Sequence, residues 1–330
     1  MKTQTRTDSA DSGVMTLART FARKPGLETG QVIDGRTIAS DLAAEVAREV
    51  RALHASGGSA GIATLLIGDD YAARAYERRI GKMAAGLGVA WYQRRLPGDA
   101  SQSDVLAEIG RLNADPTVSG TLILRPVPAH IAEEEIFTAL EPAKDIEAVH
   151  PENAGLLALG RPRYVPSTPA AVFHVLDRWL DASGEDRTDF YHRSLVTVVG
   201  RSSNVGKPTV SLAYDRQAAV ESVDEWASRT GQLGLYTRRA DVLIVAAGVP
   251  GLIRAEHVRQ GAVVLDVGIN RITDPATGAG RLVGDVQFDA VTPRARAITP
   301  VPGGIGPVTD VWVIRNTATA ARNAASAHAV

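Results

Sequence analysis

The stretch Val196-Thr-Val-Val-Gly200-Arg-Ser-Ser-Asn-Val-Gly206-Lys-Pro208 decides how the second half of the chain folds. An apolar, β-branched run ends at Gly200, and Gly206 and Pro208 follow where a helix would begin. Glycine lets the backbone turn sharply and approach a ligand closely, and proline is tolerated in the first helical turn. Such a turn directs backbone N–H groups and the positive end of a helix dipole at one point, which suits a phosphate. The spacing G-x-S-x-x-x-G departs from the usual G-x-G-x-x-G, so alone it also fits an ordinary strand–turn–helix.

Three more short apolar runs follow this stretch. They predict strands near 218–223, 240–248 and 261–268, and the last two runs end in glycine. Four successive strands of this kind favour a Rossmann-type dinucleotide-binding domain over a chance loop.

The residues around the second strand of this unit leave the identity of the dinucleotide open. Three acids lie at or just past that strand, where an acid commonly holds the ribose hydroxyls of NAD: Glu221, Asp224 and Glu225. Three other side chains, close by in the expected fold, suit the extra phosphate of NADP: Arg201, Ser228 and Arg229.

The first half of the chain alternates strands with helices. Apolar residues at helical spacing predict helices over 38–57, 71–86 and 103–113, and short apolar runs predict strands at 62–67, 89–92 and 120–124. This alternation indicates parallel strands joined by helical crossovers, and the nearly continuous apolar strands suit a sheet covered on both faces. A junction at 166–169 leads into a predicted helix at 170–181, and the polar segment 183–194 predicts an irregular surface excursion.

Three loops carry candidate site residues. Arg125-Pro-Val-Pro128 follows the third strand, at the edge of the sheet where open α/β proteins usually bind ligands. The loop 144–153 concentrates Asp145, Glu147 and His150, although a polar surface loop with a helix cap would look the same. The segment 298–309 is dense in glycine and proline, which suits close approach to a flat ligand or a tight turn before the predicted helix 308–325.

Composition excludes several classes of function. The 330 residues are 45% hydrophobic and 22% charged with a net charge of −1, which fits a globular protein without a global field for nucleic acid or anionic membranes. The chain has no cysteine, so disulfides, thiolate metal sites and a cysteine nucleophile are excluded. No apolar run approaches the roughly 20 residues of a membrane span. Residues 1–29 lack periodicity and contain acids that targeting peptides avoid, so we expect a disordered tail and a cytoplasmic protein.

The chain carries a set of short motifs beyond this tail: Ile33-Asp-Gly35, Gly200-Arg-Ser202, Val205-Gly-Lys-Pro208, Arg239-Ala-Asp241, Asp266-Val-Gly-Ile-Asn270, Val283-Gly-Asp-Val286, Thr299-Pro-Val-Pro-Gly-Gly304 and Gly306-Pro307. Together they resemble the methylenetetrahydrofolate dehydrogenase/cyclohydrolase family over about residues 31–325. The resemblance implies a folate-binding catalytic domain with a parallel sheet (30–168 plus 309–330), a Rossmann-type NAD(P)-binding domain (169–308) and a last helix that returns to the first domain. Members oxidise 5,10-methylenetetrahydrofolate with NADP or NAD in one-carbon metabolism, and most also hydrolyse the methenyl product to 10-formyltetrahydrofolate. They are usually homodimers.

The departures from the family pattern are as informative as the matches. The family's catalytic helix carries a tyrosine, matched by Tyr76, and a lysine four residues later, where this chain has Ile80. Leu124 stands where the family has a glutamine, and Glu147 stands where it has an aspartate. Arg79 is about 60° round the helix from Tyr76 and within reach of the site, but with a pKa above about 12 it cannot act as a base.

The leading hypothesis is therefore an NAD(P)-dependent dehydrogenase, an oxidoreductase whose hydrolase step is weak or lost. The site residues that the resemblance implies fall into three sets: catalytic Tyr76, Arg79 and Glu147; substrate-binding Tyr76, Leu124, Pro126, Pro302, Gly303 and Gly304; cofactor-binding Gly200, Arg201, Ser202, Gly206, Ser228, Arg229, Gly248 and Ile269. No metal is expected. Two alternatives stay open: an enzyme of the same family acting on a modified pterin or another one-carbon carrier, and a non-catalytic protein that binds cofactor and folate.

Overall fold

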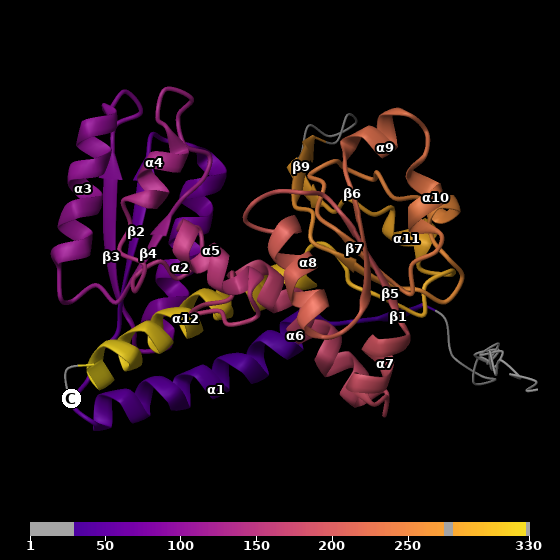
Figure 1. The fold of residues 1–330 in the computed structure, drawn as a ribbon, viewed down its shortest axis with the longest axis horizontal. Coiled ribbons are helices and arrows are strands. Elements are labelled where there is room, and N and C mark those ends of the chain that lie inside the picture. The colour runs from indigo at the N-terminus through magenta and orange to yellow at the C-terminus, as the bar shows by residue number, and fades with distance from the viewer. Residues whose placement is uncertain (1–29, 274–279, 328–330) are drawn as a thin grey trace, which may run out of the picture.

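The chain forms two α/β lobes joined by long helices (Figure 1). A computed structural model describes residues 30–273 and 280–327. The disordered tail expected at 1–29 lies outside the described residues.

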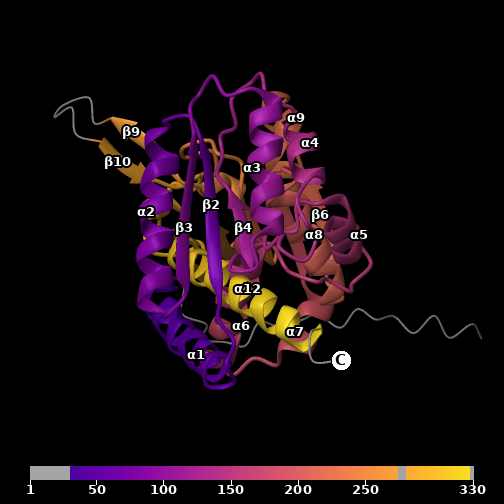
Figure 2. The ribbon, with the colours of Figure 1, turned by 90° about the vertical axis from the view of Figure 1, so that its left-hand side faces the viewer.

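The first lobe is built on a three-stranded parallel sheet with the order β3-β2-β4. Its strands and helices are β2 (Gly61–Ile67), α2 (Tyr71–Gly86), β3 (Ala90–Leu96), α3 (Gln102–Ala114), β4 (Gly120–Ile123), α4 (Glu133–Thr138) and α5 (Pro151–Ala158). Every residue of β2 and β4 is buried, as expected for strands covered on both faces. Figure 2 shows the sheet with α2 and α3 beside it.

The second lobe is built on a six-stranded parallel sheet with the order β1-β11-β8-β7-β5-β6. Its elements are β1 (Gln31–Val32), α7 (Arg187–Arg193), β5 (Leu195–Val199), α8 (Gly206–Asp215), β6 (Ala219–Val223), α9 (Glu225–Arg229), α10 (Leu233–Thr237), β7 (Val242–Val245), η1 (Ala255–His257), β8 (Val263–Asp266), α11 (Phe288–Val291) and β11 (Ala297–Ile298). A separate antiparallel hairpin joins β9 (Asn270–Thr273) and β10 (Gly280–Val283).

Three long helices connect the lobes: α1 (Gly35–Ala55), α6 (Ser167–Ala182) and α12 (Ile305–Ala327). The described part of the chain enters the second sheet with β1 and crosses to the first lobe along α1. After β11, α12 returns and packs against α1, α6 and α2 (Figure 1). One apolar cluster includes residues of α1, α2, α6, α12 and β11, so the lobes share a core. The predicted two-domain α/β fold is confirmed, with a parallel sheet in each lobe and a returning C-terminal helix.

The expectation for 183–194 is wrong, because the structure has α7 within this segment. Asp186 caps the helix by accepting a hydrogen bond from the Asp189 N–H at 2.8 Å. Phe190 and Tyr191 are buried against α6, and Phe190 makes an edge contact with Trp179. Two adjacent aromatics anchor a segment whose remaining residues are polar.

Candidate active site

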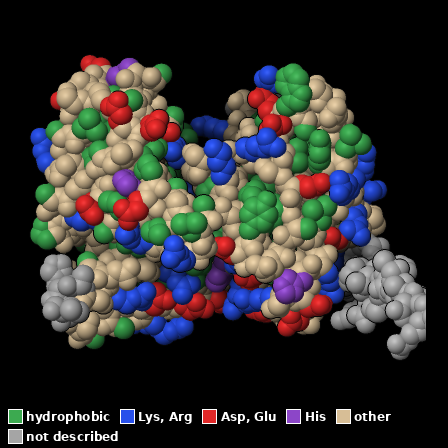
Figure 3. Space-filling model, viewed as in Figure 1, with side chains coloured by type: hydrophobic (Ala, Val, Ile, Leu, Met, Phe, Trp, Pro, Cys, Tyr) green, Lys and Arg blue, Asp and Glu red, His purple; other side chains and the backbone are tan. Residues whose placement is uncertain are grey.

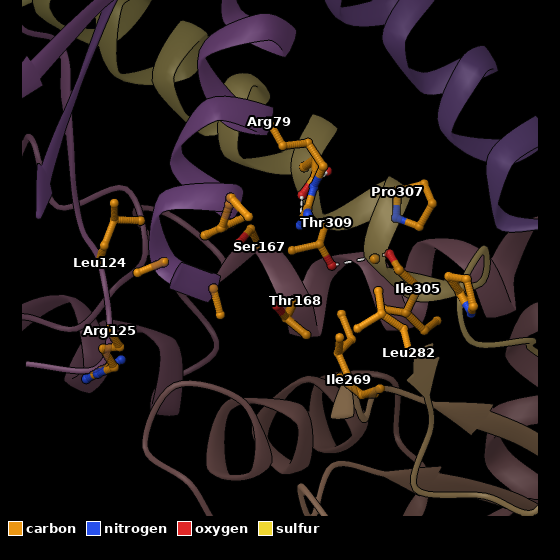
Figure 4. A pocket seen from close by; sticks show the side chains of 18 of the residues that line it. Arg79, Leu124, Arg125, Ser167, Thr168, Ile269, Leu282, Ile305, Pro307 and Thr309 are labelled. Carbon is orange, nitrogen blue, oxygen red and sulfur yellow. Dashed lines mark hydrogen bonds and ion pairs between the residues drawn. The ribbon is translucent and has the colours of Figure 1, made fainter. Parts of the chain in front are cut away.

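A cavity of about 1220 Å³ lies between the two lobes. It is visible as the hollow at the centre of Figure 3. Its lining includes nine residues singled out from the sequence: Tyr76, Arg79, Leu124, Pro126, Glu147, Ile269, Pro302, Gly303 and Gly304. The fold thus gathers positions that span more than half of the chain around one space (Figure 4).

Helix α2 presents Tyr76 and Arg79 to this cavity and turns Ile80 away from it. The helix begins after Asp70, whose carboxylate accepts a hydrogen bond from the Ala73 N–H at 2.8 Å. Ile80 is fully buried in the apolar core and is not among the lining residues. The exposed Lys82 does not line the cavity either. The basic group that α2 offers to the cavity is therefore Arg79.

Arg79 is held in place by Asp310, on the first turns of α12. The Arg79 Nε forms an ion pair with Asp310 Oδ2, and Arg79 Nη2 lies 3.2 Å from Asp310 Oδ1 (Figure 4). The guanidinium carbon is 5.0 Å from the centre of the Tyr76 ring. Burial is the largest single influence and would lower the pKa of Arg79, but the hydrogen bonds to Asp310 and the nearby charges of Asp310 and Tyr76 together outweigh it and raise that pKa. Arg79 is thus a permanent cation and cannot act as a base.

Glu147 projects from the loop between α4 and α5 toward the same space. Its Oε2 accepts a hydrogen bond from the Ser167 hydroxyl at 2.8 Å, and the Ser167 N–H lies 3.3 Å from both carboxylate oxygens. Burial raises the pKa of Glu147 to about 7, although the Ser167 hydrogen bonds act in the opposite direction. Burial, followed by the nearby charge of Glu147, also raises the pKa of Tyr76 well above its usual value. Glu147 is therefore a carboxyl poised to ionise near neutral pH.

The other polar residues of this loop are structural. Asp145 is buried and accepts hydrogen bonds from the N–H groups of Val149, at 3.1 Å, and His150, at 2.8 Å. His150 caps α5, because its Nδ1 accepts from the Glu152 N–H at 3.0 Å. Of the three titratable side chains singled out in the loop, only that of Glu147 lines the cavity.

Leu124 and Arg125 form the wall below β4 (Figure 4). Leu124 is buried and adds apolar surface to the cavity. Arg125 Nε is 2.7 Å from Glu133 Oε1, and its guanidinium carbon lies 4.5 Å from the centre of the Phe137 ring. The charges of Arg79 and Arg125 are both balanced by an acid, so neither adds a free positive charge at the rim.

The segment 299–304 builds the opposite wall largely from backbone. A Cβ at Gly304 would lie 2.6 Å from the Pro300 carbonyl oxygen, and a Cβ at Gly35 would lie 1.7 Å from the Gly304 carbonyl oxygen. Thr299 holds the segment against the second sheet by accepting a hydrogen bond from the Asp266 N–H at 2.8 Å. The glycines are needed where α1, this segment and α12 converge.

The turn after β5 has the geometry of a phosphate-binding loop. Gly200 has a φ of +117°, and a Cβ there would lie 2.1 Å from the Ala246 carbonyl oxygen. A Cβ at Gly206 would lie 2.1 Å from the Gly200 carbonyl oxygen. The Ser202 hydroxyl accepts from the Gly206 N–H at 3.2 Å as α8 begins. This cradle, which side chains would fill, fits the phosphates of a dinucleotide.

The remaining predicted cofactor residues lie at different distances from the main cavity. Ile269 lines it and is 57% exposed, which suits one face of a flat ring. Gly248 ends the β7 loop, and its N–H donates to Asp285 at 2.8 Å. Arg201 lies against the end of β6, and Ser228 and Arg229 are on α9; none of the three lines the cavity.

Sequence reasoning missed several residues of the site. Ser167 was placed in a domain junction, although it holds Glu147. Asp310 lies in the predicted helix 308–325, where no site residue was expected, although a buried acid on an apolar face is a signal for a partner. Arg271, on the β9–β10 hairpin, lies 5.0 Å from the Tyr71 ring centre and bridges the lobes at the cavity.

The described residues contain neither a metal-binding cluster nor a membrane-spanning helix. In residues 30–273 and 280–327, no cluster of three or more histidine, cysteine or acidic side chains could hold a metal ion. None of the helices in this part of the chain is long and apolar enough to cross a membrane.

Comparison with known proteins gives a consistent result. The catalytic domain of tetrahydrofolate dehydrogenase/cyclohydrolase matches residues 33–147, and the NAD(P)-binding domain of the same family matches residues 166–325. The bifunctional protein FolD 3 of Rubrobacter xylanophilus is 60% identical over 298 residues, which cover 90% of this chain and 93% of that protein. The bifunctional protein FolD of Salinibacter ruber is 40% identical over 300 residues, covering 90% and 98% of the two chains.

Solved structures of this family share the fold. The bifunctional FolD of Campylobacter jejuni superposes with a TM-score of 0.81 at 32% identity, covering 89% of this chain and 99% of that chain. The Trypanosoma brucei methylenetetrahydrofolate dehydrogenase-cyclohydrolase, complexed with NADP and an inhibitor, gives a TM-score of 0.82 at 33% identity, covering 90% and 99% of the two chains.

Proposed function

The chain belongs to the tetrahydrofolate dehydrogenase/cyclohydrolase family and is a dehydrogenase of that family, and we propose that its cyclohydrolase step is weak or lost. The reaction is the oxidation of 5,10-methylenetetrahydrofolate to 5,10-methenyltetrahydrofolate with NADP or NAD. Cyclohydrolase activity would convert that product to 10-formyltetrahydrofolate.

The observation that carries the proposal is the replacement of the family's lysine by a buried isoleucine. Hydrolysis of the methenyl group requires a water to be activated, which needs a group that takes and gives protons near neutral pH. Ile80 offers none and is fully buried. Arg79 is the cation that α2 presents to the cavity, but its ion pair with Asp310 keeps it protonated.

Oxidation, unlike hydrolysis, does not require a protein side chain that accepts or donates a proton. A bound NAD(P) accepts the hydride, and the protein contributes position and electrostatics. The C–H bond of the methylene bridge breaks, its electron pair leaves with the hydride, and a cationic N–C–N unit remains without any proton transfer. Tyr76 and Glu147 would hold the pterin, with the carboxylate beside the developing cation, and Pro302, Gly303 and Gly304 would let the ring system approach the backbone closely.

The remaining assignments are proposals as well. Gly200, Ser202, Gly206 and Gly248 would hold the phosphates and the adjoining ribose, and Ile269 would pack on the nicotinamide side. Arg201, Ser228 and Arg229 would lie toward the adenosine ribose. Residues 30–168 with 309–330 would form the folate domain and residues 169–308 the cofactor domain. We also expect a homodimer in the cytoplasm.

A second candidate, the full bifunctional enzyme, has one specific observation in its favour. Glu147 has a pKa of about 7 and lines the cavity, so its carboxylate has the proton affinity of a general base. Its near relatives are also named bifunctional proteins. Against this reading, Ser167 already donates two hydrogen bonds to the carboxylate, which leaves fewer lone pairs to accept a proton from water.

A paired assay separates the two candidates. The purified protein is given 5,10-methylenetetrahydrofolate with NADP or NAD, and reduced cofactor and methenyl product are followed together. We expect methenyl product to accumulate in step with reduced cofactor. Methenyl product that stays low while reduced cofactor rises would support the bifunctional enzyme. Neither product would point to an altered one-carbon substrate or a binding protein, to be separated by cofactor and folate binding.

A further inference from the structure

We propose that Asp224, supported by Glu225, makes this chain select NAD over NADP. The inference rests on the proposed use of the second lobe as the NAD(P) site and adds which of the two dinucleotides it takes.

The position of Asp224 is fixed by the sheet. It follows β6 directly, and β6 pairs with β5 in parallel so that Val223 is beside Val199. The Gly200 N–H donates to the Val223 carbonyl at 2.9 Å, which places Asp224 next to the phosphate-binding turn. In doubly wound dinucleotide folds, an acid at this strand end accepts hydrogen bonds from the ribose hydroxyls.

The guanidinium of Arg201 is already occupied at this place. Its Nη1 is 2.9 Å from Asp224 Oδ2, its Nη2 donates to the Ser222 carbonyl at 2.6 Å, and its Nε donates to the Ser222 hydroxyl at 3.2 Å. All three nitrogens therefore bond the end of β6 instead of facing outward as a phosphate clamp.

Arg229, the second arginine that could bind the 2′-phosphate of NADP, also forms an ion pair with an acid. Arg229 Nη2 lies 2.5 Å from Glu225 Oε1, one turn earlier on α9. The two arginines and the two acids sum to zero charge. A 2′-phosphate carries about −1.5 to −2 charges at pH 7 and would meet two carboxylates beside balanced arginines. A ribose 2′-hydroxyl, in contrast, can donate to Asp224.

These groups are well exposed, so the discrimination is electrostatic and moderate. The side chains of Arg201 and Asp224 are 49% and 44% exposed, and exposed ion pairs yield readily to a stronger partner. We therefore expect NAD to bind about tenfold more tightly than NADP, rather than NADP being excluded. The difference between the affinities for NAD and NADP should become smaller as salt screens the carboxylates.

The test is calorimetric titration of the full chain with NAD and with NADP, without folate, at low and high salt. Asp224→Ser removes the carboxylate, frees Arg201 and leaves a small hydroxyl. We expect this variant to bind NADP more tightly than the wild type, to bind NAD less tightly, and so to reverse the preference. Asp224→Ser combined with Glu225→Gln should shift the ratio further.

A matched control is Asp189→Asn, which breaks a 3.2 Å ion pair with Arg193 on α7 of the same lobe, away from the turn. It should leave the NAD-to-NADP ratio unchanged. If the wild type bound NADP more tightly than NAD, or if Asp224→Ser left the NAD-to-NADP affinity ratio unchanged, the proposed NAD selectivity would be wrong. The proposed dehydrogenase function would stand, because NADP can also serve as the oxidant. Binding of neither dinucleotide would overturn both.

Discussion

The two walls of the central cavity are built in different ways. The wall from the second lobe and the segment 299–304 is largely backbone, and a Cβ at Gly304 would meet the Pro300 carbonyl oxygen. The opposite wall, formed by α2, by Leu124 and Arg125 after β4 and by the loop that holds Glu147, is made of side chains. On these segments three family positions carry Ile80, Leu124 and Glu147, and Ile80 is buried behind the wall instead of lining it. A backbone-built site tolerates little change because each glycine also holds the fold together. A side-chain wall can exchange its chemistry while the helix and strand stay in place, as they do here.

The largest expected effect concerns the glycine-built turn after β5 in the second lobe. In Gly206→Ala, the new Cβ would lie 2.1 Å from the Gly200 carbonyl oxygen, so the turn has to open. We expect kcat/KM for the dinucleotide to fall at least about 100-fold, equivalent to about 2.7 kcal/mol. Steady-state kinetics with varied cofactor measures the loss. Gly110→Ala on α3, where a Cβ would meet nothing within 4 Å, should leave kcat/KM unchanged. Equal activity of both variants would show that the turn does not hold the cofactor.

The next largest effect is on the pH dependence of stability, through Glu147. The pKa of Glu147 is raised from 4.5 to about 7, so the folded protein keeps this proton after the unfolded chain has lost it. The stability that this carboxyl contributes is present below about pH 4.5 and is lost as pH rises to about 7, by at most about 3 kcal/mol. Glu147→Gln should therefore be more stable than the wild type at pH 8, and the two should converge in acid. Urea unfolding at several pH values measures the difference.

Glu134→Gln on α4 is the control for this series, because Glu134 is exposed and does not line the cavity. Its stability difference from the wild type should not vary with pH. In the same preparations, the oxidation kcat/KM of the wild type should fall below about pH 7 as Glu147 is protonated, and Glu147→Gln should lack that step. If the oxidation kcat/KM of the wild type did not fall below about pH 7, Glu147 would have no role in binding or oxidising the substrate.

A smaller effect is expected for the ion pair that fixes Arg79. Arg79→Met leaves the buried Asp310 carboxylate without its partner, which we expect to cost about 2 kcal/mol, below the range for fully buried pairs because Arg79 is half-exposed. Arg79→Met with Asp310→Asn should recover most of that loss. Oxidation should weaken in both variants, while methenyl hydrolysis should stay at the wild-type level. A loss of hydrolysis in Arg79→Met would show that the arginine takes part in it.

The smallest effect concerns the residue after Glu147. Ala148 has a φ of +50°, a conformation that costs an L-residue about 1–2 kcal/mol. Ala148→Gly removes this cost but loses a buried methyl, so we expect a net gain of about 0.5 kcal/mol. Ala154→Gly, in helix α5, should instead lose about 1 kcal/mol. Denaturant midpoints compare the two, and a loss in both would show that Ala148 is not strained.

Much of this structure follows from local pattern. Apolar runs and glycine-ended strands predicted the three strands of the first sheet and four of the six in the second, since burial on both faces demands continuous apolar residues, but not the two-residue strands β1 and β11. The pattern failed at α7, where two aromatics bury a segment that is otherwise polar, and it gave no sign of the β9–β10 hairpin. Prediction from local sequence pattern is least reliable where only a few side chains pack a segment against the rest of the protein.

The site was predictable to the extent that motifs marked it. Tyr76, Glu147 and the segment 299–304 were placed from short matches, and the fold brings them to one cavity. The contact of Arg79 with Asp310 joins positions 231 residues apart, and no local spacing encodes it. The same is true of Ser167, whose hydroxyl bonds Glu147 across 20 residues. Partners that set the charge of a site are long-range contacts, so they become visible only in the folded chain.

The most direct measurement is the disappearance of 5,10-methenyltetrahydrofolate in the presence of the wild-type protein, compared with buffer alone. Oxidation of 5,10-methylenetetrahydrofolate in the same preparation confirms that the protein is active. We expect oxidation together with hydrolysis at or little above the buffer rate, because Ile80 replaces the lysine and Arg79 cannot accept a proton. Hydrolysis as fast as oxidation would contradict this, and its loss in Glu147→Gln would identify that carboxylate as the base.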